Sequence, residues 1–165
     1  SEKDNEALWI GIANGCLDTV GSDDAGVPTA DRIRLSQGRF DKVPNGMPGI
    51  EPRLAILYTE GVMKGKISLP KLVSVASTAT AKIFGLYPQK GHLGAGADAD
   101  VVIYDPEPEW VMSAKNHHMN TDFSPFEGFK IKGKVDSVLC RGSFVIKDGA
   151  LVGKPGHGKR IFRRL

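Results

Sequence analysis

The stretch LDTVGSD at positions 17–23 decides the fold class, because it predicts a short buried strand that ends on a carboxylate. The residues that follow, 24–28, do not continue a strand easily, so Asp23 is expected where a strand stops and a loop begins. In barrels of alternating strands and helices, catalytic groups collect at that position, since the strand fixes the backbone and the loop leaves room for substrate. The plainer alternative is that Asp23 begins an ordinary turn, as aspartate often does.

The first half of the chain predicts helices around this strand. Apolar residues at helical spacing predict helices over 4–14, 51–63 and 69–84. Gly15 and Gly85 suit the left-handed conformation that ends a helix, and Ser68 suits an N-cap. A helix, a tight turn and a strand form half of a repeating α/β unit, so this half indicates an α/β fold.

The second half predicts β structure. Strands are expected at 99–104, 110–113, 134–140, 143–147 and 150–152. Arg141-Gly142 and Asp148-Gly149 are predicted turns between the last three strands, and an Asp-Gly pair is a strong hairpin signal. We therefore expect a boundary near residue 90, which divides the chain into domains at 1–90 and 91–165.

The segment 24–49 has no long periodic pattern, and a loop of this length is uncommon inside a domain unless it is functional. It contains VPNGMPG at 43–49, in which Asn45-Gly46 is a turn pair and the flanking prolines stiffen the backbone. Such a turn exposes main-chain N–H and C=O groups at a fixed place, which suits recognition of a small planar amide. An ordinary surface turn is the alternative.

Composition narrows the class of partner. The 165 residues carry a net charge of +3, which is too small to indicate nucleic acid, and no apolar run approaches the length of a membrane span. The acidic first residues do not resemble a secretory signal, and the absence of a starting Met suggests a fragment or a processed chain. Basic residues gather in a C-terminal tail, for which a solvated or partner-docking role is favoured over a phosphate contact: Lys154, Lys159, Arg160, Arg163 and Arg164.

Cysteine and histidine patterns do not predict a metal site in this chain. Cys16 and Cys140 lie far apart in apolar surroundings, so buried thiols in a reducing cytosol are expected, and the location is predicted to be cytoplasmic. His117 and His118 are adjacent, and neighbouring side chains point different ways from an extended chain. We expect structural hydrogen bonding by both histidines.

Taken together, the motifs resemble the C-terminal part of the cyclic amidohydrolases, and most closely the D-hydantoinases and dihydropyrimidinases. The matching stretches cover nearly the whole chain in family order. They are LDTVGSD (17–23), DKVPNGMPGIEPRLAILYTEGV (41–62), KIFGLYPQKGHLGAGADADVVIYDPE (82–107), SAKNHHMNTDFSPFEGFKIKGK (113–134) and VLCRGSFVIKDGALVGKPGHGK (138–159).

This resemblance implies a fold and an activity. The fold would be the C-terminal portion of a metal-dependent TIM-like α/β barrel, with residues 91–165 adding part of a β-sandwich. The activity would be hydrolysis of the amide bond in a hydantoin or dihydropyrimidine ring by a hydroxide held between two divalent metal ions, usually zinc. The family is commonly tetrameric, so a homo-oligomer is expected, with the basic tail after Gly153 reaching a neighbouring subunit.

The resemblance also assigns site residues. By the SD motif, Asp23 corresponds to the carboxylate that is both a metal ligand and the proton shuttle. By the PNG turn, Asn45 corresponds to the asparagine that contacts the cyclic amide through its backbone. Asp24 and Ala25 depart from the family pattern of His, Gln or Asn followed by Cys, so Asp24 either adds negative charge beside the site or points into solvent.

The remaining metal ligands of the family lie upstream of these 165 residues. We therefore expect the isolated chain to be inactive and to expose unpaired strand edges and apolar helix faces. A non-catalytic assembly protein of the collapsin response mediator type is one alternative, marked by loss of metal ligands. A stand-alone α/β domain is another, and it would place residues 17–22 in a small closed sheet.

Overall fold

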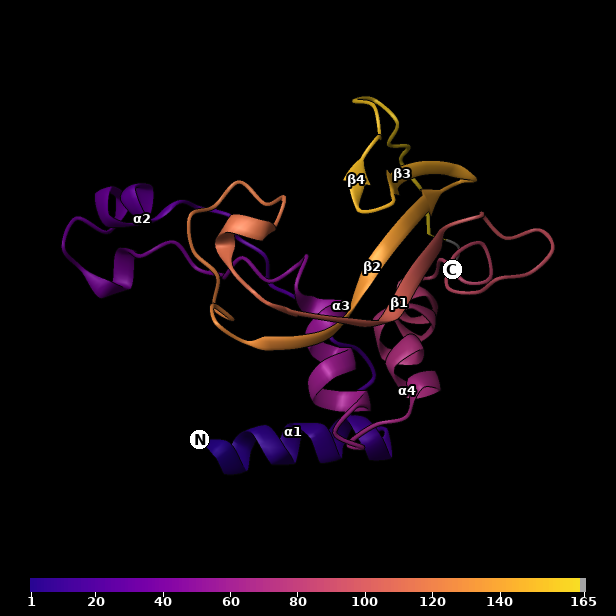
Figure 1. Cartoon of the computed structure of the whole chain (residues 1–165), viewed down its shortest axis with the longest axis horizontal. Coiled ribbons are helices and arrows are strands. Elements are labelled where there is room, and N and C mark those ends of the chain that lie inside the picture. Colours follow the sequence, from indigo (N-terminus) through magenta and orange to yellow (C-terminus); the bar gives the residue numbers. More distant parts are fainter. Residues whose placement is uncertain (164–165) are drawn as a thin grey trace.

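A computed structural model describes residues 1–163 of the chain, and Arg164, the penultimate residue of the basic tail, lies outside the described residues. The helices precede the strands along the chain (Figure 1). The helices are α1 (Glu2–Asn14), α2 (Thr29–Ser36), α3 (Arg53–Ile56), α4 (Leu69–Val73) and α5 (Ala79–Ile83), with π-helical turns at Leu57–Val62 and Ser74–Thr78 and short 3-10 turns at Phe40–Lys42 and Ala114–Asn116. The strands are β1 (Val101–Val111), β2 (Lys130–Cys140), β3 (Ser143–Lys147) and β4 (Ala150–Leu151).

The helices predicted over 4–14, 51–63 and 69–84 are confirmed. In α1, Ser1 and Asp4 form a capping box, and Gly15 ends the helix at φ 86°. The second predicted helix is α3 continued by the first π turn, and the third is α4, the second π turn and α5 in succession. Ser68 caps α4, because its hydroxyl accepts a hydrogen bond from the amide of Lys71.

The helices share one apolar core. Its buried members are Ile12, Leu57, Ile67, Leu72 and Val75, with Trp9 and Val20 packed against them. Figure 1 shows α1 lying across the ends of the two helical rods that begin with α3 and α4.

The strands form one antiparallel sheet in the order β1-β2-β3-β4. Arg141 and Gly142 (φ 49° and 79°) and Asp148 and Gly149 (φ 51° and 76°) make the predicted turns, so both hairpins are confirmed. The prediction of two strands at 99–104 and 110–113 was wrong. A single strand, β1, spans Val101–Val111, because the register shift between Asp105 and Glu109 absorbs the prolines as a bulge.

The helical rod that begins with α3 packs against β2. The Thr59 hydroxyl accepts a hydrogen bond from the Lys132 amide at 3.1 Å and donates one to the Lys132 carbonyl at 3.2 Å. A second apolar cluster of Ala55, Met112 and Ile131 joins this rod to β1 and β2. The helical half and the sheet are therefore connected by both hydrogen bonds and apolar contacts.

The segment 17–49 differs from two expectations. Residues 17–22 lie mostly at the surface, where a buried strand was expected, and they form no strand among the described residues, because those residues supply no hydrogen-bonded neighbour; Val20 instead donates to the carbonyl of Val75 at 3.2 Å. The loop at 24–49 contains α2, whose eight residues are too few to show a helical period. Cys16 is exposed instead of buried, since it follows the end of α1 at the surface.

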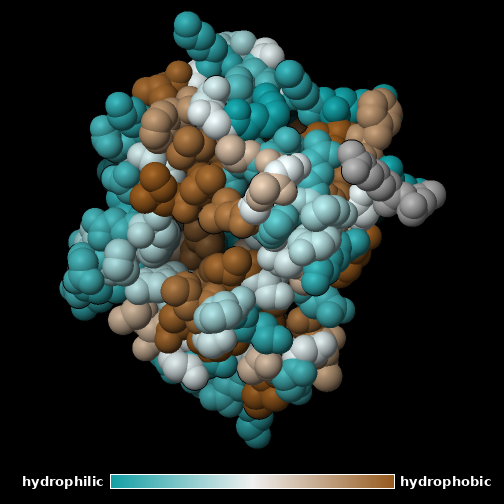
Figure 2. Space-filling model, turned by 90° about the vertical axis from the view of Figure 1, so that its right-hand side faces the viewer, coloured by the Kyte–Doolittle hydropathy of each residue, from teal (hydrophilic) through white to brown (hydrophobic). Residues whose placement is uncertain are grey.

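Large apolar side chains remain exposed, as expected. Leu69, Ile83, Phe84 and Val102 are each more than half exposed. Figure 2 shows a band of apolar side chains, hollowed at its centre, on the face that corresponds to the right-hand side of Figure 1, where α4 and β1 lie. A contiguous apolar surface of this kind indicates contact with further protein. Within residues 1–163, none of the helices has both the length and the apolar character needed to cross a bilayer.

The turn that enters β1 is held by charge. The Lys90 ammonium forms ion pairs with Asp98, at 2.8 Å, and with Asp100. The hydrogen bond from Lys90 is the main reason that the pKa of Asp98 lies below its usual value of 3.8. Burial pushes the pKa of Asp100 upward, but hydrogen bonds from Lys90 and from the Arg141 amide outweigh it and leave that pKa lowered as well.

Lys90→Met should therefore lower the melting temperature of the complete gene product in a pH-dependent way. A carboxyl whose folded pKa is lowered contributes stability above its unfolded pKa and loses it as pH falls through the folded value. The loss caused by Lys90→Met should be full at pH 6 and should shrink below about pH 3.8. Lys64→Met, which removes the exposed Lys64–Glu60 pair, is the control and should change little. A loss that is constant from pH 6 to pH 3 would contradict this assignment.

The helical core makes a second prediction. Leu72 is 4% exposed and Leu69, on the same helix, is 53% exposed. Leu72→Ala should reduce the free energy of unfolding by about 2–5 kcal/mol, because it leaves a cavity, whereas Leu69→Ala should cost well under about 1 kcal/mol. Denaturant unfolding of both variants measures the difference, and equal losses would place the core elsewhere.

Candidate active site

Asp23 lies on the surface at the end of the extended segment 17–22. Its backbone φ is 45°, in the left-handed region that costs a residue with a side chain roughly 1 kcal/mol or more, although aspartate tolerates it better than most. The side chain is exposed, and among residues 1–163 no hydrogen bond or ion pair occupies its carboxylate. The carboxylate is therefore available to a ligand or to groups from further protein.

The turn that contains Asn45 lies beside Asp23. The Met47 amide donates to the Asp23 carbonyl at 3.3 Å, and the Ala25 amide donates to the Met47 carbonyl at 3.2 Å. These two bonds make a parallel bridge between Asp24 and Met47. The structure thus brings the backbones on either side of Asp23 and Asn45 together, although they are far apart in the sequence. Asn45 itself is exposed.

Gly46 permits this close approach. It has φ 81°, and a Cβ built on it would lie 2.5 Å from the Asp23 carbonyl oxygen and 2.8 Å from the Ala25 Cβ. No other residue type fits between the two segments without displacing one of them. Pro48, two residues later, is fully buried and fixes the exit of the turn.

Asp24 has a role that sequence reasoning missed. Its carboxylate oxygen Oδ1 accepts hydrogen bonds from the amides of Gly49, at 2.9 Å, and Ile50, at 3.1 Å. The side chain therefore points along the turn and holds it, instead of standing free in solvent. No local signal in the sequence could have revealed this, because the partners are 25 and 26 positions away.

Arg32 of α2 was also missed. Its guanidinium donates to carbonyls on both sides of the bridge, at Ala25 and Val27 and at Pro44 and Gly46. A helix of eight residues inside a predicted loop gave no reason to single out this arginine.

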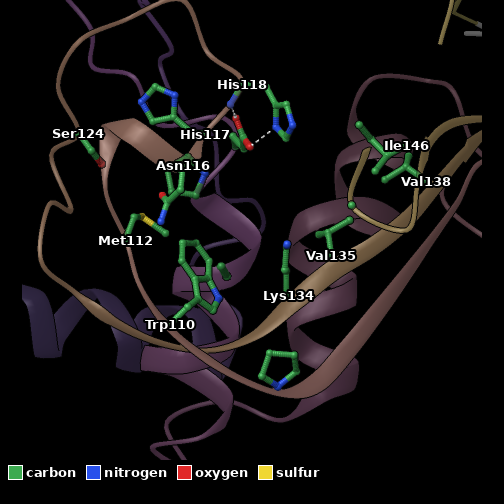
Figure 3. A pocket seen from close by; sticks show the side chains of 15 residues that line it. Trp110, Met112, Asn116, His117, His118, Ser124, Lys134, Val135, Val138 and Ile146 are labelled. Carbon is green, nitrogen blue, oxygen red and sulfur yellow. Dashed lines mark hydrogen bonds and ion pairs between the residues drawn. The ribbon is translucent and has the colours of Figure 1, made fainter. Parts of the chain in front are cut away.

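A cavity of about 700 Å³ lies between the first turn of α3 and strands β1 and β2 (Figure 3). Trp110, Met112 and Lys134 line it, whereas Asp23 and Asn45 do not. We place the candidate site at Asp23 and Asn45, because the cavity walls are mostly apolar and carry no free carboxylate. Glu51 lines the cavity and lies three residues beyond Pro48, so it connects the cavity to the turn that contains Asn45.

The two adjacent histidines behave differently. His118 is held as expected, because Glu51 accepts a hydrogen bond from its amide at 2.7 Å and contacts its Nδ1 at 2.8 Å. The expectation was wrong for His117, whose ring nitrogens are buried beside the cavity without a partner among residues 1–163. Figure 3 shows the two imidazoles pointing in different directions.

The described residues do not make a complete metal site. Within residues 1–163, no three His, Cys, Asp or Glu side chains are close enough together to hold one ion. Asp23 can supply a single carboxylate ligand, and a stable divalent-metal centre in a protein takes three or more. A metal bound at Asp23 would therefore need ligands from outside these residues.

The chemistry open to this site is that of a carboxylate beside a fixed set of backbone groups. A free carboxylate can accept a proton from an attacking water and return it to a leaving group. The exposed N–H and C=O groups of a tight turn can hold a planar amide by matched hydrogen bonds. The bridge between Asp24 and Met47 keeps the segment that carries the carboxylate next to the turn that carries the backbone groups.

Comparisons with known proteins identify the family of this chain. The sequence profile of the Amidohydrolase family matches residues 1–145. The chain is 51% identical over 158 residues to a D-hydantoinase of Geobacillus stearothermophilus, covering 96% of this chain and 34% of that protein. It is 41% identical over 162 residues to a D-phenylhydantoinase of Escherichia coli, covering 98% of this chain and 35% of that protein.

Solved structures agree as well. A D-hydantoinase from a Bacillus species superposes with a TM-score of 0.95 at 48% identity, covering 99% of this chain and 36% of that chain. The dihydropyrimidinase of Brevibacillus agri superposes with a TM-score of 0.92 at 46% identity, covering 96% of this chain and 34% of that chain. This chain thus spans about a third of the length of the curated relatives that it matches.

The contact at Gly46 makes a prediction with a matched control. Gly46→Ala and Gly38→Ala both place a side chain at positive φ, 81° and 73°, but only Gly46 faces other atoms within 4 Å. Gly38→Ala should cost about 1–2 kcal/mol in the free energy of unfolding. Gly46→Ala should cost more and should also accelerate amide exchange at Ala25 and Met47, measured by hydrogen exchange on the complete gene product. Similar costs and similar exchange would contradict the close approach.

Proposed function

Because this chain belongs to the amidohydrolase family, we propose that it supplies the C-terminal third of a hydrolase that opens the cyclic amide bond of hydantoins or dihydropyrimidines. The observation that carries the proposal is the 48% identity and TM-score of 0.95 against a D-hydantoinase over 99% of the chain. The collapsin response mediator alternative predicts loss of metal ligands, and Asp23 argues against it.

The proposed role of Asp23 is to move a proton. Its carboxylate would take the proton of the attacking water and give it to the ring nitrogen as the C–N bond breaks, which leaves a carboxylic acid and a ureido NH2 group. The free and exposed state of this carboxylate supports the role. The Asn45 backbone would orient the ring, since a planar cyclic amide offers a donor and an acceptor side by side.

Metal dependence is a property of the hydantoinase branch of this family. We propose two divalent ions, zinc by the resemblance, with Asp23 as one ligand and the rest of the set from protein beyond these 165 residues. When bound, such ions would supply an activated water at neutral pH.

We propose that this chain is the C-terminal part of a longer protein. Residues 17–23 would be the last strand of an α/β barrel, residues 1–90 its closing helices, and residues 91–165 part of a β-sandwich. The segment 17–22, which has no strand partner among residues 1–163, and the exposed apolar side chains of α4, α5 and β1 support this, because each needs protein to cover it. A cytoplasmic homo-oligomer, a tetramer by the resemblance, belongs to the same proposal.

A chimaeric enzyme tests the function. This chain should replace the matched third of the Geobacillus stearothermophilus D-hydantoinase and give a protein that opens hydantoin and dihydrouracil, whereas the isolated chain should be inactive. In that chimaera, Asp23→Asn should lower kcat by about 100-fold or more. Asp18→Asn, on the same exposed segment, is the control and should leave kcat unchanged. Activity that survives Asp23→Asn would reject the assigned role.

Metal removal is a separate test on the same chimaera. Dialysis against a chelator should abolish ring opening, and added zinc should restore it, because the described residues hold no complete site that could substitute. Elemental analysis should find metal in the chimaera and none above background in the isolated chain. Stoichiometric metal in the isolated chain would show that these 165 residues hold a complete metal site by themselves.

A further inference from the structure

Arg32 makes an unusual set of contacts for a surface-helix residue. Its Nε donates to the Val27 carbonyl at 3.1 Å, and its Nη1 donates to the Pro44 carbonyl at 2.8 Å. Its Nη2 donates to the carbonyls of Ala25, at 3.0 Å, and Gly46, at 2.8 Å. One half-buried guanidinium thus donates four hydrogen bonds, each to a different backbone carbonyl oxygen.

These oxygens belong to the two segments that form the site. Ala25 and Val27 follow Asp23, and Pro44 and Gly46 flank Asn45 on either side. Arg32 therefore joins the two segments from α2, a third element. It is itself held there, because the Phe123 ring lies 5.2 Å from the guanidinium carbon.

Because the peptide group is planar, the contacts of Arg32 with the carbonyls also fix the direction of the N–H groups that follow them. In a trans peptide the C=O and the following N–H point in opposite directions, and the peptides at 44–45 and 46–47 are trans. Since the Gly46 carbonyl faces Arg32, the Met47 amide faces away, toward the Asp23 carbonyl that it reaches at 3.3 Å. By the same geometry the Asn45 amide points away from Arg32, and among residues 1–163 no hydrogen bond occupies it.

We propose that Arg32 is a positioning residue, which sets the distance and orientation between the Asp23 carboxylate and the Asn45 turn. This inference rests on the proposed function in so far as both groups act on one cyclic amide. Lysine cannot replace arginine here, because its ammonium is a point donor with three N–H bonds, whereas the planar guanidinium serves four oxygens at once.

The neighbouring helix position offers a matched control. Arg34 is exposed, and its guanidinium contacts only Asp31, one helical turn away, among the described residues. Arg32→Met and Arg34→Met remove the same charge from the same helix. Only Arg32→Met also removes the hydrogen-bond donor of the carbonyls around the site.

The first test does not depend on activity. In the complete gene product, Arg32→Met should accelerate amide hydrogen exchange at Ala25 and Met47 by about 10-fold or more, whereas Arg34→Met should leave exchange there unchanged. Arg32→Lys should fall between the two and serves as the milder variant if Arg32→Met does not fold. Unchanged exchange at Ala25 and Met47 in both Arg32 variants would overturn the proposal.

The second test uses turnover of hydantoin at constant metal content. Arg32→Lys and Arg32→Met should lower kcat/KM by about 10- to 100-fold, with kcat reduced and KM raised, because both the proton shuttle and the ring contact move. Free guanidinium ion should partly restore activity to Arg32→Ala and should not affect Arg34→Ala. A loss of melting temperature without a change in kcat or KM would assign Arg32 a structural role only.

The two failures can be told apart. A wild-type protein that opens no cyclic amide would reject the proposed function, while the exchange experiment would still decide whether Arg32 holds the two segments. An active wild type with an active Arg32→Met variant would reject the positioning role and leave the function intact.

Discussion

The structure of the candidate site depends on the short parallel bridge between Asp24 and Met47. Its two backbone hydrogen bonds tie the end of the extended segment to a turn that follows after more than twenty residues. Closing a loop of that length costs conformational entropy, and two hydrogen bonds of about 1 kcal/mol each do not offset it alone. The rest of the local structure can be understood as reinforcement of this bridge.

The reinforcement comes from two side chains of opposite charge. Asp24 accepts from amides beyond the turn, and Arg32 donates to carbonyls before and within it. Each charge meets backbone groups of the opposite polarity, and such charge-assisted bonds are stronger than those between neutral groups. Gly46 completes the arrangement, because its missing Cβ lets the two backbones touch. Specific side chains on three segments therefore define one small surface.

Much of this fold could be predicted from the sequence, since its helices and hairpins carry local signals. The helical spacing of 69–84 and the Asp148-Gly149 pair act over a few residues, and the structure confirms both. The strand at 17–22 was expected and is absent, because strand pairing is a long-range property that the described residues do not satisfy. The short helix α2 and the bulged strand β1 were missed for similar reasons, as tertiary contacts decide them.

Some residues of the candidate site could likewise be identified from the sequence, and others could not. Asp23 and Asn45 were assigned through the family resemblance, because on local sequence alone each of the two motifs also fits an ordinary turn. Asp24 and Arg32 could not be identified, because their partners are backbone groups that any sequence presents and only the folded loop brings them together. His117, whose buried ring nitrogens have no partner in the part of the chain that the structure describes, also shows that a histidine pair in sequence does not imply a shared role.

The proposed activity requires that Asp23 and the Asn45 turn face one cyclic amide. A crystal structure of the complete gene product with a bound hydantoin or its ring-opened product tests this most directly. We predict that the ring lies within about 2.7–3.2 Å of the Asn45 backbone, with the Asp23 carboxylate at the same end of the molecule. A ring bound elsewhere, for example in the cavity beside Trp110 with Asp23 in open solvent, would contradict the account.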